Sequence, residues 1–369
     1  MHSDVILVIV VGTALAFDFT NGFHDTANVV ATSISTRALS PRLAVLLAAA
    51  LNFLGAFISL SVAATIGKGI IEVAAASTTV IFAGLIGAIA WNLITWYFGL
   101  PSSSSHALIG GVVGSAFVAS GASAIKGEGL LEKVVVPALI APVLAFAVAG
   151  LAILFAYRIV GRLRPGPVNR GFRAGQIASG GLLALAHGTN DAQKTMGIIT
   201  LALVAHGDIS SDPARFDVPG WVVIAAASAI ALGTYTGGWR IIRTLGSRII
   251  KMDPAQGFSA QGAGAAVILV SSHFGYPLST THTISGAVMG AGAARRFSAV
   301  RWGVAGNIAC AWVMTLPAAA AIGAAVYGVT RAFGTGALGP VVVAASILTA
   351  LAVFFVRRLQ RGSVLTVEA

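Results

Sequence analysis

The strongest constraint on the fold is the recurrence of long apolar stretches along the whole chain. About twenty residues of helix cross the hydrocarbon core of a bilayer. Charged residues make up only 9% of the 369 residues, whereas soluble domains carry about 25%. We therefore predict an all-α integral membrane protein. Its predicted apolar elements, some too short to be full crossings, are residues 5–36, 43–66, 79–98, 103–119, 134–157, 174–204, 219–239, 258–275, 279–294, 302–329 and 339–356.

Basic residues predict the orientation of the chain in the membrane. They gather after the first, fifth, seventh, ninth and eleventh apolar elements, so a single side of the membrane can hold them all. Loops rich in Arg and Lys stay in the cytoplasm, which puts the N-terminus outside and the C-terminus inside a multi-pass protein of the cell membrane. The net charge of +11 therefore reflects topology, and we expect lipid but no nucleic acid as a partner. The clusters lie in residues 37–42, 158–173, 240–251, 295–301 and 357–361.

Two sequence motifs each occur twice, in the same order. The segment NGFHDTAN at residues 21–28 matches HGTNDAQK at residues 187–194, and GLPSSSSHALIGGVVG at residues 99–114 matches GYPLSTTHTISGAVMG at residues 275–290. Five elements make up the first copy, and because five is odd the second copy must cross the membrane in the opposite sense. Inverted-topology repeats of this kind, with interrupted helices in matching places, are typical of secondary transporters.

The repeats divide the chain into four parts. We predict a first inverted repeat at residues 1–160, a cytoplasmic basic linker at 161–173 and a second inverted repeat at 174–330. Residues 331–369 are left over, and we predict that they form an extra C-terminal transmembrane helix and tail.

The first motif pair places a carboxylate inside an apolar element of each repeat. Asp25 and Asp191 occupy equivalent positions, and a carboxylate at membrane depth is costly unless it is paired or bound to an ion. Gly22 and Gly188 permit a helix break, and the nearby Asn residues can satisfy the freed backbone groups. We therefore predict two discontinuous helices, broken at residues 21–28 and 187–194. Asn21, Asn28 and Asn190 are predicted to complete the polar shell of the site.

The second motif pair predicts an anion site built from helix N-termini. In each copy Gly and Pro end an apolar element, a hydroxyl run follows, and a Gly-rich helix begins. Hydroxyl side chains cap helix starts, and the free N–H groups there attract oxyanions. Two such ends, approaching from opposite sides, would surround a tetrahedral anion. The turns are either re-entrant hairpins or links between full crossings. The predicted donors are Ser103, Ser104, Ser105, Ser279, Thr280 and Thr281.

Lys194 distinguishes the two repeats, because it stands where the first repeat has Asn28. It follows Asp191 by three residues, which puts both on one face of a helix. A lysine at membrane depth requires a carboxylate or an anion beside it. It can either neutralise Asp191 or bind substrate oxygens directly.

These four motifs resemble the duplicated signatures of the PiT inorganic phosphate transporters. The resemblance extends to about residue 330. It implies an inverted-repeat carrier that imports phosphate with a cation, often as a homodimer, and in some bacterial members as a complex with a divalent metal. It implies no resident cofactor. Sodium-coupled members bind Na⁺ through the Asp and Asn residues of both loops, which would place a sodium site at Asp25 and Asp191. Because Lys194 replaces the second Asn, we expect coupling to H⁺ rather than Na⁺. Asp25, Asn28 and Asp191 are the predicted coupling residues, and the two aspartates bind the coupling cation or accept its proton.

Three other functions remain open on the residues alone. A carrier of sulfate or another tetrahedral oxyanion would use the same scaffold, although a carboxylate acceptor favours phosphate, which keeps a proton near neutral pH. A divalent-cation transporter would use the Asp and His residues but would leave the hydroxyl-rich turns without a role. A membrane enzyme is disfavoured because no nucleophile and base occur at a recognisable spacing.

Overall fold

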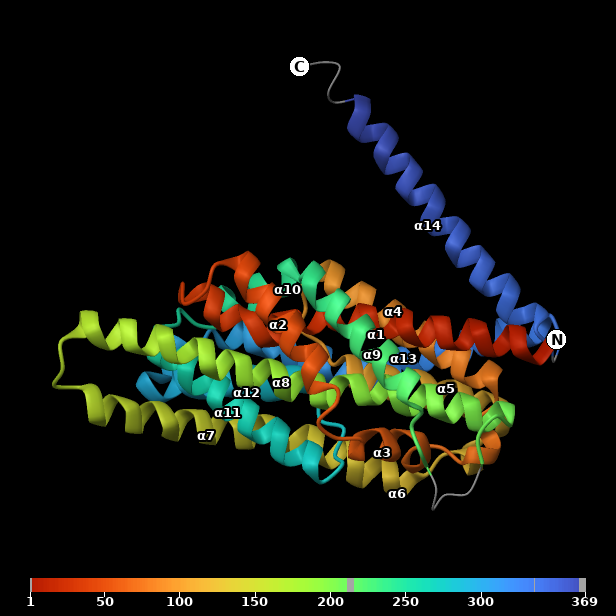
Figure 1. Cartoon of the computed structure of the whole chain (residues 1–369), viewed down its shortest axis with the longest axis horizontal. Helices are drawn as coiled ribbons and strands as arrows, with labels where there is room; N and C mark the ends of the chain where they lie inside the picture. The colour runs from red at the N-terminus through yellow and green to blue at the C-terminus, as the bar shows by residue number, and fades with distance from the viewer. Residues whose placement is uncertain (1, 211–215, 335, 365–369) are drawn as a thin grey trace.

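The computed structural model describes residues 2–210, 216–334 and 336–364, and these residues are almost entirely helical (Figure 1). Within these ranges the only β-type pairing is an isolated bridge between Ile71 and Ile125. The predicted all-α class is confirmed. The first half contains α1 (His2–Ser35), α2 (Pro41–Gly55), α3 (Ser61–Gly69), α4 (Thr78–Phe98), α5 (Ser104–Ser120), α6 (Gly127–Leu130) and α7 (Val136–Val160).

The second half has a similar order of helices, except that no α-helix stands between its last two matching helices and that an additional helix follows them. A π-helical turn at Leu131–Val135 joins α6 to α7, and a second one at Thr244–Arg248 follows α10. The helices of this half are α8 (Pro165–His206), α9 (Gly220–Thr236), α10 (Trp239–Arg243), α11 (Pro254–His273), α12 (Thr280–Arg295), α13 (Trp302–Ala332) and α14 (Leu338–Val364).

Several of these helices have the length and composition of membrane crossings. By these criteria four described segments qualify, namely Asp4–Ser35, Thr78–Phe98, Gly127–Val160 and Trp302–Ala332. A fifth is the bent pair of α9 with Trp239–Arg248, which turns by 59°. Large apolar side chains on α7, including Leu139 and Val143, are 69% and 68% exposed, as expected for a surface that faces lipid.

The helix breaks lie in elements other than those predicted. Both α1 and α8 run without interruption through residues 21–28 and 187–194, so the prediction of broken helices there is wrong. Gly22 and Gly188 do not adopt the left-handed conformation. Instead they let helices approach closely: a Cβ at Gly22 would lie 2.3 Å from the Ile230 oxygen of α9, and one at Gly188 would lie 2.1 Å from the Asn52 oxygen of α2.

The interruptions occur in the second element of each half. The predicted element 43–66 is divided into α2 and α3 by residues 56–60, and the predicted element 219–239 ends at the bend between α9 and α10. Asp25, Asn28, Asp191 and Lys194 reach hydrogen-bond partners on other helices or on their own helix while the backbones of α1 and α8 stay helical. The predicted linker 161–173 is also shorter in the structure, because Pro165 stands in the first turn of α8, where its fixed φ favours a helix start.

Helices of one half pack against helices of the other in matching pairs. α1 contacts α9 and α8 contacts α2, while α5 contacts α13 and α12 contacts α7. In the latter two pairs the close approach is at glycine. Cβ atoms at Gly114 and Gly290 would each lie 2.1 Å from a carbonyl oxygen, of Ala320 and Phe146 respectively. Such small-residue contacts are the main means of holding membrane helices together, because lipid offers no hydrophobic driving force between them.

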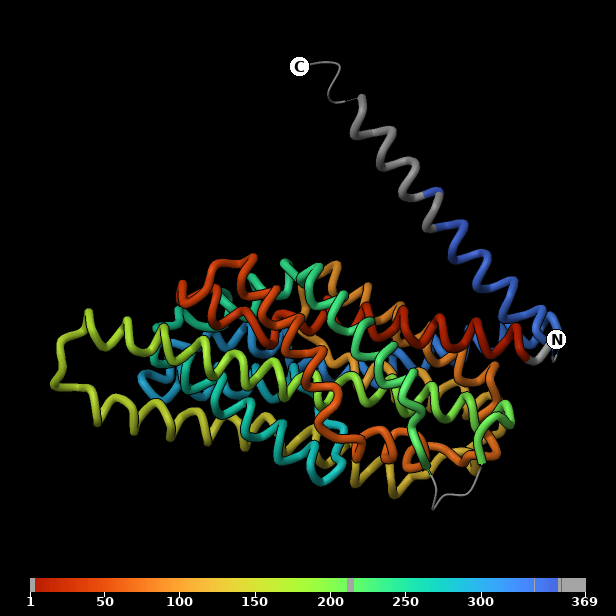
Figure 2. The backbone as a smooth tube through the Cα atoms, viewed as in Figure 1, coloured from red at the N-terminus to blue at the C-terminus, as the bar shows by residue number. Residues whose placement is uncertain are grey.

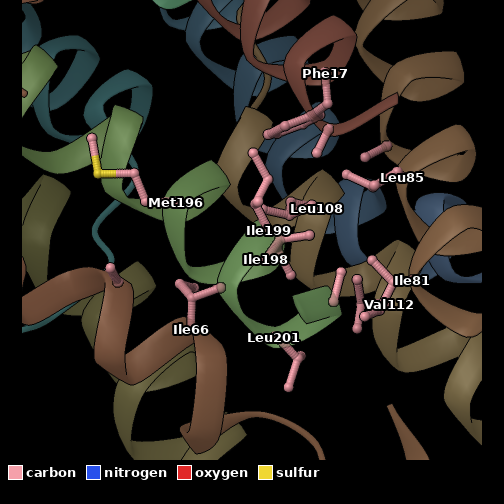
Figure 3. Packing of buried hydrophobic residues seen from close by; sticks show 14 of the residues in the cluster. Phe17, Ile66, Ile81, Leu85, Leu108, Val112, Met196, Ile198, Ile199 and Leu201 are labelled. Carbon is pink, nitrogen blue, oxygen red and sulfur yellow. The ribbon is translucent and has the colours of Figure 1, made fainter. Parts of the chain in front are cut away.

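Two hydrophobic clusters flank the polar centre of the bundle. The first joins α1, α3, α4, α5, α8 and α9, and Figure 3 shows Phe17, Leu85 and Leu108 meeting Ile198 and Ile199 of α8. The second cluster is built on α2, α7, α11 and α12 together with the later part of α1. Figure 2 shows α1 and α8 running in opposite directions along the length of the bundle. This arrangement holds the middles of α1 and α8, which carry the first motif pair, at the centre of the molecule.

Candidate functional site

The two hydroxyl-rich turns have the same local structure. Gly99 and Gly275 end α4 and α11 with positive φ values of 66° and 74°, a conformation that glycine adopts without strain. The chain then extends through the Pro and begins the next helix. The Ser103 hydroxyl accepts a hydrogen bond from the His106 amide at 3.1 Å, and the Ser279 hydroxyl accepts one from the His282 amide at 3.2 Å. Both serines are therefore N-caps of α5 and α12.

The starts of α5 and α12 face each other. The rings of His106 and His282 meet edge to face with their centroids 4.8 Å apart, and the Ser105 hydroxyl donates to the Leu278 carbonyl at 3.4 Å. Each helix contributes free N–H groups and the positive end of its dipole at this point. The structure thus brings the six predicted hydroxyl residues to one place.

Lys194 lies between these two helix starts and is 1% exposed. Its ammonium group donates to the Ser105 hydroxyl, to the Asp191 carboxylate and, at 2.9 Å, to the Leu278 carbonyl. A lysine ammonium has three hydrogens, so all of them are used. Of the two roles predicted for Lys194, this conformation shows the pairing with Asp191.

Asp191 is completely buried and has three polar neighbours. Besides Lys194, the His187 Nε2 atom lies 3.0 Å from its carboxylate, and the Thr280 hydroxyl donates to it at 3.2 Å. His187 in turn contacts the Asn52 side chain of α2 through Nδ1 at 3.2 Å. The carboxylate is therefore held by the helix that carries it and by the start of α12.

Asp25 of α1 has a similar set of partners. The His24 Nδ1 atom lies 2.8 Å from its carboxylate, and the Thr281 hydroxyl donates to it at 3.3 Å. The other ring nitrogen of His24 lies 3.1 Å from the Thr95 hydroxyl of α4. Both aspartates thus combine a histidine neighbour with a hydroxyl from the start of α12.

The remaining predicted residues contribute in different ways. Asn28 donates to the hydroxyls of Thr280 and Thr281 at 3.3 and 2.9 Å. Asn190 instead fixes the turn between α11 and α12, donating to the Ser272 hydroxyl and the Tyr276 carbonyl at 2.8 and 3.3 Å. The Asn21 side chain is 1% exposed on α1. All twelve predicted site residues are between 0% and 4% exposed, so this conformation closes the site to solvent.

Several polar atoms of the site have no hydrogen-bond partner among the described residues. They include the Ser104 hydroxyl and the side-chain oxygens of Asn21, Asn28 and Asn190. Buried polar groups are normally paired, so these atoms are able to take a partner from a bound molecule. Of these residues, Ser104 lies in the first turn of α5, and Asn28 contacts Thr280 and Thr281 at the start of α12.

Asp25, His187 and Asp191 form a compact cluster of potential ligands. One donor atom from each lies within 4.8 Å of the other two. The fit to Na⁺ is poor, because hard cations take oxygen ligands, and here one of the three donors is imidazole. The Lys194 ammonium beside Asp191 also repels a cation.

Residues outside the predicted set also hold the site. His24 and His187 support the two aspartates, and Thr95 and the Leu278 carbonyl complete the contacts. The sequence carried a signal for the histidines, since both lie within the first motif pair. The Asn and the His have swapped positions between the two motifs. Asn21 corresponds to His187, and His24 corresponds to Asn190.

Fold and site together define a helical membrane protein with a buried polar centre between two facing helix starts, and comparison with known proteins gives its family. A sequence model of the phosphate transporter family matches residues 21–167 and 164–323. The chain therefore belongs to the phosphate transporter family, and it is a multi-pass membrane transporter and not an enzyme. The resemblance recognised in the four motifs is confirmed.

Individual relatives agree with this assignment. The chain is 52% identical over 329 residues to a protein of Mycobacterium bovis named probable low-affinity inorganic phosphate transporter. The aligned region covers 89% of this chain and 78% of that protein. A protein of the same name from Rhizobium meliloti is 51% identical, with 87% and 96% covered. A solved structure named the sodium-dependent phosphate transporter is similar with a TM-score of 0.78 and 27% identity, over 89% of this chain and 99% of that one.

Proposed function

We propose that the protein imports inorganic phosphate across the cell membrane in symport with protons. The observation that carries this proposal is the position of Lys194 between two facing helix N-termini, each capped by a serine. A lysine, free backbone N–H groups and hydroxyls are the donors that bind phosphate in proteins. The names of the relatives support the same substrate.

In this proposal phosphate binds where α5 and α12 meet. Ser103, Ser104 and Ser105 contribute from one repeat, and Ser279, Thr280 and Thr281 contribute from the other. Phosphate oxygens take the place that the Asp191 carboxylate and the Leu278 carbonyl now hold on Lys194. The unpartnered oxygens of Asn21, Asn28 and Asn190 accept from a protonated phosphate oxygen, which sulfate does not carry at neutral pH.

Coupling to protons is favoured by the composition of the region around Asp25 and Asp191. These carboxylates lie beside His24, His187 and Lys194, and cationic neighbours oppose the binding of Na⁺. Protonation and deprotonation, by contrast, change the charge of such a cluster without requiring any free coordination position.

The two halves work, in our proposal, as inverted repeats that move past each other. The matching contacts of α1 with α9 and α8 with α2, and of α5 with α13 and α12 with α7, support this symmetry. In Figure 1 the N-terminus lies at the end of the bundle opposite the turn between α7 and α8, in agreement with the proposed orientation of an outer N-terminus and a cytoplasmic basic turn. Rocking of the repeats would open the closed site to each side in turn.

Sodium-coupled phosphate symport is the second candidate, because the similar solved structure is named as a sodium-dependent phosphate transporter. In that case Asp25 and Asp191 would bind Na⁺ and Lys194 would have to leave Asp191. The proximity of the two carboxylates favours this candidate, and the imidazole and ammonium groups oppose it.

The substrate assignment is tested by uptake of radiolabelled phosphate into proteoliposomes that contain the purified protein. We expect sulfate in excess to leave uptake unchanged, and Ser105→Ala and Asp191→Asn to lower it at least tenfold. Ser77→Ala removes a serine N-cap from α4 instead and serves as the matched control. Added Mg²⁺ distinguishes transport of a metal-phosphate complex from transport of the free anion. Equal uptake by wild type, Ser105→Ala and Asp191→Asn would show that the site lies elsewhere.

A further inference from the structure

Asp18 is a buried carboxyl group that the proposed phosphate site does not use. It lies in the interior of α1 with 0% of its surface exposed. Neither of its oxygens has a hydrogen-bond partner among the described residues. Asp25 and Asp191, in contrast, each have a histidine and a hydroxyl within reach. Asp18 is thus the one buried aspartate of the described chain without such support.

The position of Asp18 connects it to the site. It precedes Asn21 by three residues and Asp25 by seven, spacings that put all three on one face of the helix. Asn21 and the Thr195 hydroxyl lie beside it, and the charges of Asp191 and Lys194 act on it. The Thr195 hydroxyl and the Asn21 side-chain oxygen likewise have no hydrogen-bond partner among the described residues.

Few ionisable groups surround Asp18. Among the helices that contact α1, neither α4 nor α9 carries an Asp, Glu, His, Lys or Arg residue. Arg240 and Arg243 of α10, which also contacts α1, are exposed to solvent. The other buried ionisable residues of the described chain are His24, Asp25, His106, His187, Asp191, Lys194 and His282.

Lys194 cannot serve as the partner of Asp18 in this conformation. Its three hydrogens are directed to Ser105, Asp191 and the Leu278 carbonyl, so none is left for a second carboxylate. A carboxylate that is removed from water without a donor or a counter-ion is strongly disfavoured relative to the neutral acid. The arrangement is therefore suited to a carboxyl group that holds a proton while Lys194 is engaged elsewhere.

We propose that Asp18, rather than the paired Asp25 or Asp191, is the binding site of the proton that accompanies phosphate, a role that rests on the proposed proton coupling and makes it more specific. A proton from the outer solution forms an O–H bond with the Asp18 carboxylate, and the same proton leaves to water on the cytoplasmic side. While Asp18 is neutral, Lys194 is available to the anion. When Asp18 loses its proton, its negative charge competes with phosphate for Lys194 and favours release. Because linkage is reciprocal, bound phosphate must also strengthen proton binding.

The experiment measures phosphate exchange separately from phosphate uptake that is driven by a proton gradient. Proteoliposomes are loaded with unlabelled phosphate to measure exchange, or with phosphate-free buffer to measure uptake driven by an inward proton gradient. In Asp18→Asn, which mimics the neutral acid, we expect exchange within threefold of wild type and gradient-driven uptake reduced at least tenfold. Asp18→Glu restores a titratable group and should restore the response to the gradient. Glu128→Gln removes an exposed carboxylate and is the matched control.

The outcomes distinguish the proposed role of Asp18 from the proposed coupling of phosphate transport to protons. A wild type that transports phosphate without any response to a proton gradient contradicts the proposed coupling. A wild type that responds, together with an Asp18→Asn variant that responds equally, contradicts the role of Asp18 alone. Loss of exchange and of gradient-driven uptake together in a folded, monodisperse Asp18→Asn protein assigns Asp18 a structural role and also overturns the proposal.

A spectroscopic measurement covers the case in which Asp18→Asn does not fold. Infrared difference spectra of the wild-type protein with and without phosphate should contain a carboxylic-acid C=O stretching band. That band should shift in Asp18→Glu, because the two acids absorb at different frequencies. A band that is absent, or identical in wild type and Asp18→Glu, contradicts proton binding at Asp18.

Discussion

Lys194 donates a hydrogen bond to Ser105, and this contact has a counterpart in the other half of the molecule. There Asn28, which occupies the position equivalent to Lys194, donates to Thr281, the residue equivalent to Ser105. The amide reaches from α1 to α12 and the ammonium reaches from α8 to α5. The two motif pairs thus meet in the same way twice, and the substitution of Asn by Lys adds a positive charge without changing the contact.

Removal of the ammonium group should destabilise the protein through Asp191. Lys194→Met leaves a completely buried carboxylate without its cationic partner, and breaking a buried ion pair in this way costs about 3 kcal/mol or more. We expect a correspondingly lower free energy of unfolding, measured by thermal unfolding in detergent. The double variant Lys194→Met with Asp191→Asn should recover more than half of the loss. If the double variant is as unstable as the sum of the single variants, the two residues do not act as a pair.

Gly22 and Gly188 should tolerate no side chain, because each touches a backbone oxygen. Alanine at either position places Cβ within 2.3 Å of the Ile230 or Asn52 oxygen, so the neighbouring helix must move. Overpacking of this kind costs about 1–3 kcal/mol. Gly12→Ala, on the same helix α1 with nothing within 4 Å of the added Cβ, should instead be neutral or stabilising by up to about 1 kcal/mol. Equal stability changes in Gly22→Ala and Gly12→Ala would show that the close packing is unimportant.

Substitution of the two serine N-caps Ser103 and Ser77 should distinguish an effect on stability from an effect on phosphate binding. Ser103→Ala and Ser77→Ala each remove a hydroxyl that accepts from an amide at a helix start, and each should cost about 1 kcal/mol of stability. Only Ser103 lies at the proposed phosphate site, so only Ser103→Ala should weaken phosphate binding, by several-fold. Calorimetric titration of the two variants with phosphate measures this difference. Similar affinities would assign Ser103 a purely structural role.

The sequence predicted the composition of the site better than the path of the backbone. Duplication of the motifs and the cost of buried charge were enough to select Asp25, Asp191 and Lys194, which the structure brings together with the hydroxyl-rich turns. The predicted helix breaks were wrong because Gly22 and Gly188 have two uses that a sequence does not distinguish. Glycine permits a break, and it also permits close packing of an intact helix.

Other features depend on which helices become neighbours. Asn190 was predicted to belong to the polar shell, but nothing in the sequence indicated that its NH₂ group also holds the turn between α11 and α12 through Ser272 and Tyr276. The isolation of Asp18 could not be predicted either, because it requires that α4 and α9, which carry no charges, pack against α1. Periodicity identifies the helices, and the tertiary contacts decide whether a buried polar residue finds a partner.

The central claim is that phosphate enters with protons, and one measurement tests it most directly. Proteoliposomes containing the wild-type protein are given an inward proton gradient in sodium-free buffer, or an inward sodium gradient at equal pH on both sides, and uptake of labelled phosphate is followed. The account predicts transient accumulation above equilibrium with the proton gradient and none with the sodium gradient. Accumulation that requires sodium and ignores the proton gradient would contradict it.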